Sequence, residues 1–111
     1  MPTQANHPLP AGYRLHGYEI EKVLSCGGFS IVYLAKDAAG EQTAIKEYLP
    51  TEIARRRADA SARPHTESHA ERYAWGLERF LAEARTLARF DHPNIVRVHS
   101  VFEGNNTAYM V

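Results

Sequence analysis

The sequence predicts an α+β fold, in which a twisted five-stranded antiparallel sheet packs against one main helix. Several segments are rich in β-favouring residues and are separated by short turns, as in an antiparallel meander. These expected strands are 18–24, 30–36, 42–48, 95–102 and 107–111. One longer stretch, around residues 77–89, repeats apolar residues at three- and four-residue steps, which is typical of an amphipathic helix. The apolar positions at this spacing begin before residue 77 and are Tyr73, Leu77, Phe80, Ala84, Leu87 and Ala88.

Length and composition limit the possible functions. A chain of 111 residues, 44% hydrophobic and 23% charged, is enough for one small globular domain. The formal net charge is zero, so nucleic acid and anionic membranes are not expected partners. The single cysteine, Cys26, excludes an internal disulfide. No apolar run approaches the ~20 residues of a membrane span, and no secretory signal opens the sequence. We therefore expect a cytoplasmic protein.

Three regions follow from the distribution of proline, glycine and charge. Residues 1–12 are expected to be a mobile leader, and residues 13–111 a single domain. Within it, residues 49–70 contain little that could be buried and are expected to form an exposed insertion. Thr51 could cap a short helix there over residues 52–57. The basic triplet 55–57 is interpreted as a solvated surface, with a docking patch as the alternative.

The helix has recognisable boundaries. Ser68 and Glu71 fit a capping box at its start, and Gly76 allows a kink. Pro93 disfavours a helical conformation in the residue before it, so the helix is expected to end there. His65 and His69 are four residues apart and could share a metal, but no acidic or thiol partner stands at ligand spacing. The sequence 105–107 matches a glycosylation acceptor, which without a secretion signal is interpreted as chance.

The strongest chemical signal lies between Leu24 and Lys46. Gly27 and Gly28 permit a positive φ and a close approach of the backbone to a ligand, and such a turn presents N–H groups to a phosphate. Downstream, Lys46 ends a strand in which the small Ala44 leaves room for a flat group. A glycine turn followed by a strand lysine indicates a polyphosphate ligand.

Two stretches resemble the amino-terminal lobe of a eukaryotic-type (bacterial) serine/threonine protein kinase. The first is L-S-C-G-G-F-S-I-V-Y-L-A-K followed by A-I-K, similar to the glycine-rich loop and lysine strand of that family. The second, F-L-A-E-A-R-T-L-A-R-F-D-H-P-N-I-V, is similar to its C-helix and the following turn. Shorter stretches (I-K-E-Y-L-P, W-G-L, A-Y-M-V) resemble bacterial members with an insertion. The resemblance covers residues 13–111.

The resemblance implies roles for individual residues. Lys46 would hold the α- and β-phosphates of ATP, and Glu83 would orient its ammonium group; the alternative for Glu83 is an exposed contact with Arg79. For Lys46 the alternative is a stem that covers apolar surface while its charge stays in water. The resemblance implies nucleotide contacts at Leu24, Ser25, Cys26, Gly27, Gly28, Phe29, Ser30, Val32, Ala44 and Lys46. Among these, Leu24, Val32 and Ala44 would cover adenine.

Two further positions, Leu87 and Val98, match the hydrophobic stack of that family. For the stack and for the adenine cover, ordinary core packing is the alternative interpretation. Ser25 and Ser30 replace family glycines, which is expected to weaken nucleotide affinity without abolishing it.

The implied reaction is transfer of the ATP γ-phosphate to serine or threonine hydroxyls of a protein substrate, with Mg²⁺ as the metal. No H-R-D or D-F-G motif occurs in the 111 residues, so we expect the metal ligands elsewhere and no kinase activity from this segment alone. The alternative is a pseudokinase-like module that binds a nucleotide or a partner. Apolar surface at the ends of the sheet also leads us to expect self-association, which sedimentation would detect.

Overall fold

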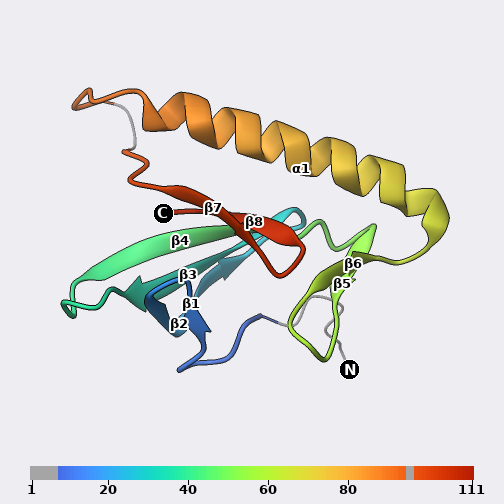
Figure 1. Ribbon diagram of the computed structural model, residues 1–111, viewed down its shortest axis with the longest axis horizontal. Coiled ribbons are helices and arrows are strands. Elements are labelled where there is room, and N and C mark those ends of the chain that lie inside the picture. Colours follow the sequence, from blue (N-terminus) through green and yellow to red (C-terminus); the bar gives the residue numbers. More distant parts are fainter. Residues whose placement is uncertain (1–7, 95–96) are drawn as a thin grey trace.

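The computed structural model describes residues 8–94 and 97–111 and shows a curled antiparallel sheet with one long helix above it (Figure 1). The six strands of the sheet run in the order β1-β2-β3-β4-β8-β7, and a separate two-stranded sheet pairs β5 with β6. The elements are β1 Arg14–Leu15, β2 Tyr18–Cys26, β3 Ser30–Lys36, β4 Gln42–Tyr48, β5 Ala54–Arg56, β6 Ala62–Pro64, α1 Glu67–Ala88, β7 Val101–Gly104 and β8 Thr107–Met110. The predicted α+β class is confirmed.

The five expected strands are present and antiparallel, with two differences. A sixth strand, β1, pairs with the start of β2 as a two-residue edge. Strand β7 begins only at Val101, later than the predicted segment 95–102, of which residues 95–96 lie outside the described part. The hairpin turn is where it was predicted: Asn105 and Asn106 both have positive φ, 52° and 60°. This is the conformation that two-residue hairpins require and that asparagine tolerates.

Strict alternation along β3 and β4 separates the two faces of the sheet. Ile31, Tyr33 and Ala35 are buried on one face. Ile45 and Glu47 on β4 are buried as well, because they follow the same two-residue period. The other face carries the intervening residues, and the strand register therefore decides which side chains can meet a ligand there.

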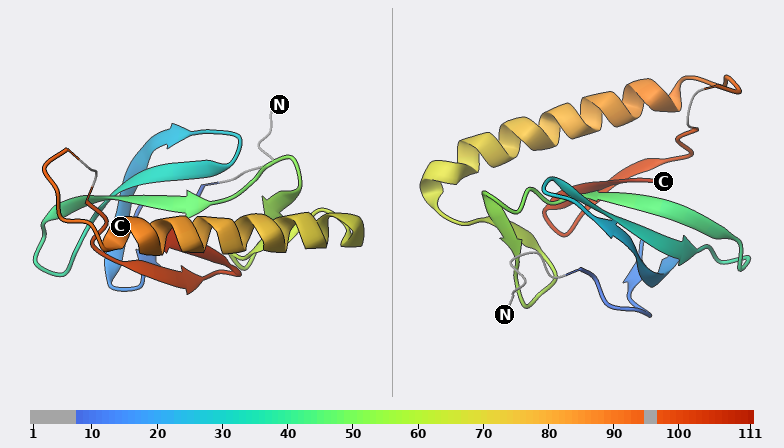
Figure 2. Two further views of the ribbon diagram at one scale, coloured as in Figure 1. Left: turned by 90° about the horizontal axis from the view of Figure 1, so that it is seen from above. Right: turned by 180° about the vertical axis from the view of Figure 1, so that it is seen from behind.

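The insertion is structured and partly buried, so the expected exposed loop with a helix over 52–57 is wrong. Residues 54–56 and 62–64 pair as a hairpin, and Ala54 and Ala62 are fully buried. The turn before it is closed by Ile53 N–H and Ala54 N–H, which both donate to the Pro50 carbonyl. The chain can bury these short strands because the hairpin lies against the end of the sheet (Figure 2).

The expected leader also differs from the structure where it is described. Leu9 is 3% exposed and belongs to the main core. Its N–H donates to the Tyr33 hydroxyl at 3.0 Å. The segment before Tyr13 is therefore packed against the sheet at Leu9, while residues 1–7 of the expected leader lie outside the described residues.

The N-cap of helix α1 is Thr66, two residues before the expected N-cap Ser68. The helix runs through Gly76 without a break. No side chain caps a backbone N–H at its start; the Thr66 hydroxyl contacts Ser68 Oγ and His69 Nδ1 instead. Of the predicted stripe, Tyr73 and Ala84 are buried, Leu77, Phe80 and Leu87 are half-buried, and Ala88 is exposed. The helix packs on β6, β7 and β8, so it leans towards one edge of the sheet.

Candidate functional site

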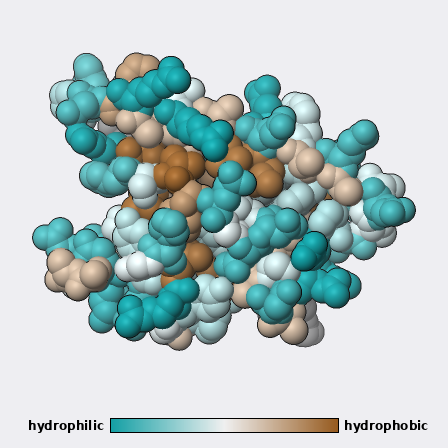
Figure 3. All heavy atoms as spheres, viewed as in Figure 1, coloured by the Kyte–Doolittle hydropathy of each residue, from teal (hydrophilic) through white to brown (hydrophobic). Residues whose placement is uncertain are grey.

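A groove of about 650 Å³ lies between the β2–β3 turn, the end of β4 and helix α1. Its lining includes Phe29, Lys46, Trp75, Phe80 and Glu83. Apolar side chains gather between the helix and the sheet in the space-filling view (Figure 3). Phe29 and Trp75 are 74% and 65% exposed, so the groove opens to solvent between two aromatic rings.

Lys46 and Glu83 both line this groove, but in this structure they do not form an ion pair with each other. Four ion pairs join described residues, and neither side chain takes part in one. Both residues are exposed. The reason lies in the packing of α1, which rests on β6, β7 and β8 and leaves the groove between itself and the end of β4. The alternative contact between Glu83 and Arg79 is not formed either; Arg79 lies over the Trp75 ring at 5.2 Å.

The face of the sheet beside Lys46 is open. Val32 stands directly opposite Lys46 in the β3–β4 register, and Ala44 lies two residues earlier on the same face. Val32 is half-buried, Ala44 is exposed, and Leu24 is 49% exposed next to an irregularity in the β2–β3 register. These three expected cover residues therefore present apolar surface that the described part of the chain does not bury.

The β2–β3 turn contains the remaining expected contacts, 25–30. Gly27 N–H is already engaged, because it donates to the Ser30 carbonyl at 2.8 Å. In the described part of the chain, the N–H groups of Gly28 and Phe29 donate no hydrogen bond. A Cβ on Gly28 would meet nothing within 4 Å, so the backbone there is free to approach another group closely. These two N–H groups of the expected row of donors are therefore available to a ligand.

Neither glycine of the turn uses a positive φ, and neither do the serines that flank it. Ser25 and Ser30 sit at ordinary φ values, so they carry no strain from the left-handed region. Cys26 pairs with Ile31 in the ladder and its thiol is exposed. The weaker nucleotide affinity expected from the two serines stays a prediction.

The two expected positions of the hydrophobic stack are buried to different degrees. Val98 is 5% exposed, and Leu87 is half-buried. Their packing agrees equally with a role in a hydrophobic stack and with ordinary core packing.

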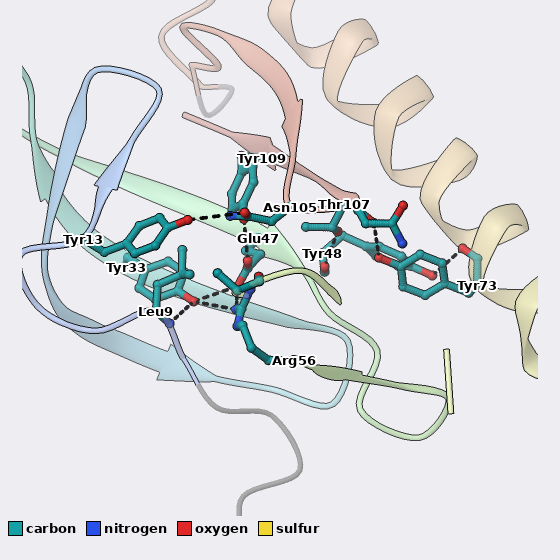
Figure 4. A network of polar contacts seen from close by, with 12 residues as sticks. Leu9, Tyr13, Tyr33, Glu47, Tyr48, Arg56, Tyr73, Asn105, Thr107 and Tyr109 are labelled. Atoms are coloured by element: carbon teal, nitrogen blue, oxygen red, sulfur yellow. Dashed lines mark hydrogen bonds and ion pairs between the residues drawn. The ribbon is translucent and has the colours of Figure 1, made fainter. Parts of the chain in front are cut away.

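A buried polar network on the other face of the sheet was missed by sequence reasoning (Figure 4). Glu47 is fully buried and its two oxygens accept from three donors. Tyr33 Oη and Tyr109 Oη each donate at 2.7 Å, and Arg56 donates at 2.5 Å in an ion pair. The Arg56 side chain is only 6% exposed, so the prediction of a solvated triplet is wrong for this arginine, although Arg55 and Arg57 are exposed.

A signal for this network was present in the sequence. Glu47 is in phase with Ile45 on an alternating strand, so the period of two already placed a carboxylate inside. A buried carboxylate needs a cation and hydrogen-bond donors. Lys46 is adjacent but lies on the opposite face by the same alternation, so the basic triplet of the insertion was the next source of that cation along the chain.

Burial and neighbouring charges shift the pKa values of three members of the network, Tyr33, Tyr109 and Arg56. Burial, followed by the charge of Glu47, raises the pKa of Tyr33 and of Tyr109 far above the ordinary value. Burial lowers the pKa of Arg56, but its hydrogen bond to Glu47 and the charge of that carboxylate raise it more, so the arginine stays charged. On the groove side, burial and Tyr73 raise the pKa of Tyr48 to about 12.

The β7–β8 turn is a junction between the insertion, the helix and the sheet. Asn105 accepts from Ala62 N–H through its carbonyl and donates through Nδ2 to the Tyr109 hydroxyl. Asn106 donates to the Ala62 carbonyl, and its own carbonyl accepts from the Tyr73 hydroxyl at 2.6 Å. The two asparagines thus connect α1 and the hairpin to the last strand.

Metal and membrane features are limited to two observations. No group of three or more histidine, cysteine or acidic side chains suited to a metal occurs within residues 8–94 and 97–111. The His65 and His69 rings lie edge to face with centroids 6.1 Å apart, and both rings have polar contacts within the protein. Among the described elements, no helix has the length and apolar character needed to cross a membrane.

The chain is similar to named protein kinases in sequence and to a solved structure in fold. The chain is 36% identical over 100 residues to the serine/threonine-protein kinase PknJ of Mycobacterium bovis and, equally, to PknJ of Mycobacterium tuberculosis. These matches cover 88% of this chain and 14% of each relative. A solved structure described as PpkA-294 apo form matches with a TM-score of 0.89 and 44% identity, covering 93% of this chain and 37% of that one. A scan against models of protein families finds no match.

The fold and these relatives define the class of protein. The chain has the fold of a protein-kinase amino-terminal lobe. It is a kinase-related domain whose homologues are bacterial serine/threonine kinases, as the resemblance implied. The chain spans about one seventh of the length of the curated relatives it matches.

Proposed function

We propose that this chain is the ATP-binding lobe of a serine/threonine kinase that transfers the γ-phosphate of ATP to hydroxyl groups of a protein substrate. One observation carries the proposal: exposed Lys46 stands beside an open apolar sheet face and shares a groove with Glu83. A strand lysine next to an uncovered flat surface suits a ligand with both a planar base and phosphates.

The parts of the site would divide the work of holding the nucleotide. Leu24, Val32 and Ala44 would cover the base, and the unpaired N–H groups of Gly28 and Phe29 would donate to phosphate oxygens. The Lys46 ammonium would neutralise charge on the α- and β-phosphates. Glu83 would orient that ammonium once α1 moves towards β4 and closes the groove. Mg²⁺ would arrive with ATP and be bound by residues beyond this segment.

The test replaces Lys46 by methionine and measures the dissociation constant of Mg·ATP by calorimetry. A charge-assisted hydrogen bond contributes about 1.5–3 kcal/mol, so Lys46→Met should weaken binding at least tenfold. Lys22→Met is the matched control, because Lys22 is an exposed strand lysine with no ion pair in the described part of the chain. Equal affinities for all three proteins, or no binding by the unchanged protein, would contradict the proposal.

Transfer of labelled γ-phosphate separates a kinase from a pseudokinase-like module. The protein as its gene encodes it should phosphorylate serine or threonine in a protein substrate, and Lys46→Met should remove that activity. Nucleotide binding without transfer would favour the module.

A further inference from the structure

The insertion touches the β2–β3 turn at the point where the proposed function places the phosphates. Leu49 N–H donates to the Phe29 carbonyl at 2.8 Å. Thr51 N–H donates to the Gly28 carbonyl at 2.9 Å, and the Thr51 hydroxyl reaches the same oxygen at 3.3 Å. Both carbonyls at the tip of the turn are therefore held by the first residues of the insertion.

Thr51 is itself held by the rest of the insertion. His65 Nε2 lies 3.1 Å from the Thr51 carbonyl oxygen, and His65 N–H donates to the Ile53 carbonyl at 2.8 Å. Beyond His65, the hairpin is anchored in the core by the ion pair between Arg56 and Glu47. A continuous series of polar contacts thus leads from the buried network to the tip of the turn.

These contacts orient a donor that the nucleotide would use. A peptide unit is planar and trans, so its C=O and N–H point in opposite directions. When the Gly28 carbonyl points at Thr51, the N–H of Phe29 must point away from the insertion. This N–H is one of the two in the turn that have no acceptor in the described part of the chain.

We propose that Thr51 is a positioning residue for phosphate binding: by holding the Gly28 carbonyl, it fixes the direction of the Phe29 N–H. This role rests on the proposed function. The insertion is then a brace for the phosphate-covering turn as well as a link between β4 and α1. Glycine loses more conformational freedom on ordering than any other residue, so a Gly-Gly turn held before the ligand arrives binds it with a smaller entropic cost.

The experiment compares Thr51→Val with Thr51→Ser in the protein as its gene encodes it. Valine keeps the shape and the backbone N–H but removes the hydroxyl, whereas serine keeps the hydroxyl. Two quantities are measured: the amide hydrogen-exchange rates of Gly28 and Phe29 without ligand, and the dissociation constant of Mg·ATP. Thr43→Val is the control, since Thr43 lies on β4 with no side-chain hydrogen bond in the described residues.

Loss of one neutral hydrogen bond should change an equilibrium about threefold to tenfold. Thr51→Val should therefore speed exchange at the turn and weaken Mg·ATP binding by about that factor, while Thr51→Ser and Thr43→Val remain close to the unchanged protein. Unaltered exchange in Thr51→Val would overturn the inference, and so would faster exchange with unaltered affinity. If the unchanged protein bound no nucleotide, the proposed function would fail together with this role, and the exchange rates would still report whether Thr51 holds the turn.

Discussion

Gly76 of the helix lies in close contact with Tyr48 of the sheet. A Cβ built there would lie 2.2 Å from Tyr48 Oη and 3.1 Å from Tyr48 Cζ. The tyrosine cannot easily move aside, because its hydroxyl donates to the Tyr73 carbonyl at 3.1 Å and its ring packs against Phe80. Glycine in the helix therefore serves close packing, while the kink that the sequence allowed is absent.

Gly76→Ala should destabilise the protein despite the better helix propensity of alanine. The propensity gain is about 1 kcal/mol, whereas forcing a methyl group into a packed contact costs about 1–3 kcal/mol. We expect a net loss of about 1 kcal/mol in the free energy of unfolding, measured by urea denaturation. The same substitution in a Tyr48→Phe background should cost less, because the closest atom is gone. A stabilised Gly76→Ala protein would show that Tyr48 moves freely.

At the scale of elements, one buried arginine anchors the insertion hairpin to the main sheet. Arg56→Met would leave the Glu47 carboxylate buried with two tyrosine donors and no cation. Removing one partner of a buried ion pair costs about 3–5 kcal/mol, and denaturant titration should show a loss of that order.

Arg55→Met provides the control for Arg56, since Arg55 is the exposed neighbour in the same strand. Its substitution should change stability by less than about 0.5 kcal/mol. The double variant Arg56→Met/Glu47→Gln should be more stable than Arg56→Met alone, because the unpaired charge is removed. Equal losses for Arg55→Met and Arg56→Met would contradict the assignment of the buried pair.

The elements that could be predicted are those whose periodicity is local. Alternation of apolar and polar residues predicts the strands around Tyr33 and Ile45. Turn chemistry predicts the Asn105-Asn106 turn, and apolar residues spaced three and four apart predict the buried side of the helix. The β5–β6 hairpin could not be predicted in this way, because three-residue strands carry almost no period. They become buried only through partners distant in sequence, such as Glu47 for Arg56 and Asn106 for Ala62.

For the whole molecule, the buried tyrosines predict a limit at alkaline pH. Tyr48 has a pKa of about 12, and the pKa values of Tyr33 and Tyr109 are raised further. An unfolded tyrosine ionises near pH 10, so above that pH the unfolded state loses protons that the folded state keeps. The stabilisation is fully present below pH 10 and decreases as the pH rises towards the folded values.

The free energy of unfolding should therefore fall above pH 10, by up to about 1.4 kcal/mol per pH unit for each such tyrosine. Denaturant titrations between pH 8 and pH 11.5 measure this slope. Tyr48→Phe should make this slope shallower, because it removes one of the buried hydroxyls with a raised pKa. A slope that Tyr48→Phe does not alter would mean that other groups control alkaline unfolding.

The proximity of some candidate residues could be predicted from the sequence, but the contacts between them could not. The order of the motifs predicted Lys46 and Glu83 in one site, and both line the groove, while Val32 and Ala44 lie on the sheet face beside Lys46. Whether the Lys46–Glu83 pair is closed depends on how α1 leans on β6–β8, which is a property of the assembled lobe. The hold of Thr51 on the turn also depends on that assembly.

The junction at Asn105 and Asn106 has a consequence for the order in which the protein can form on the ribosome. Strands β2 to β4 emerge early, yet the Glu47 carboxylate lacks Tyr109, and the hairpin lacks its carbonyl and amide partners, until residues 105–109 have left the exit tunnel. Contacts of such long sequence separation form late. The core of the nascent lobe therefore stays incomplete until Tyr109 has emerged, and chaperones have the greatest access to it in that interval.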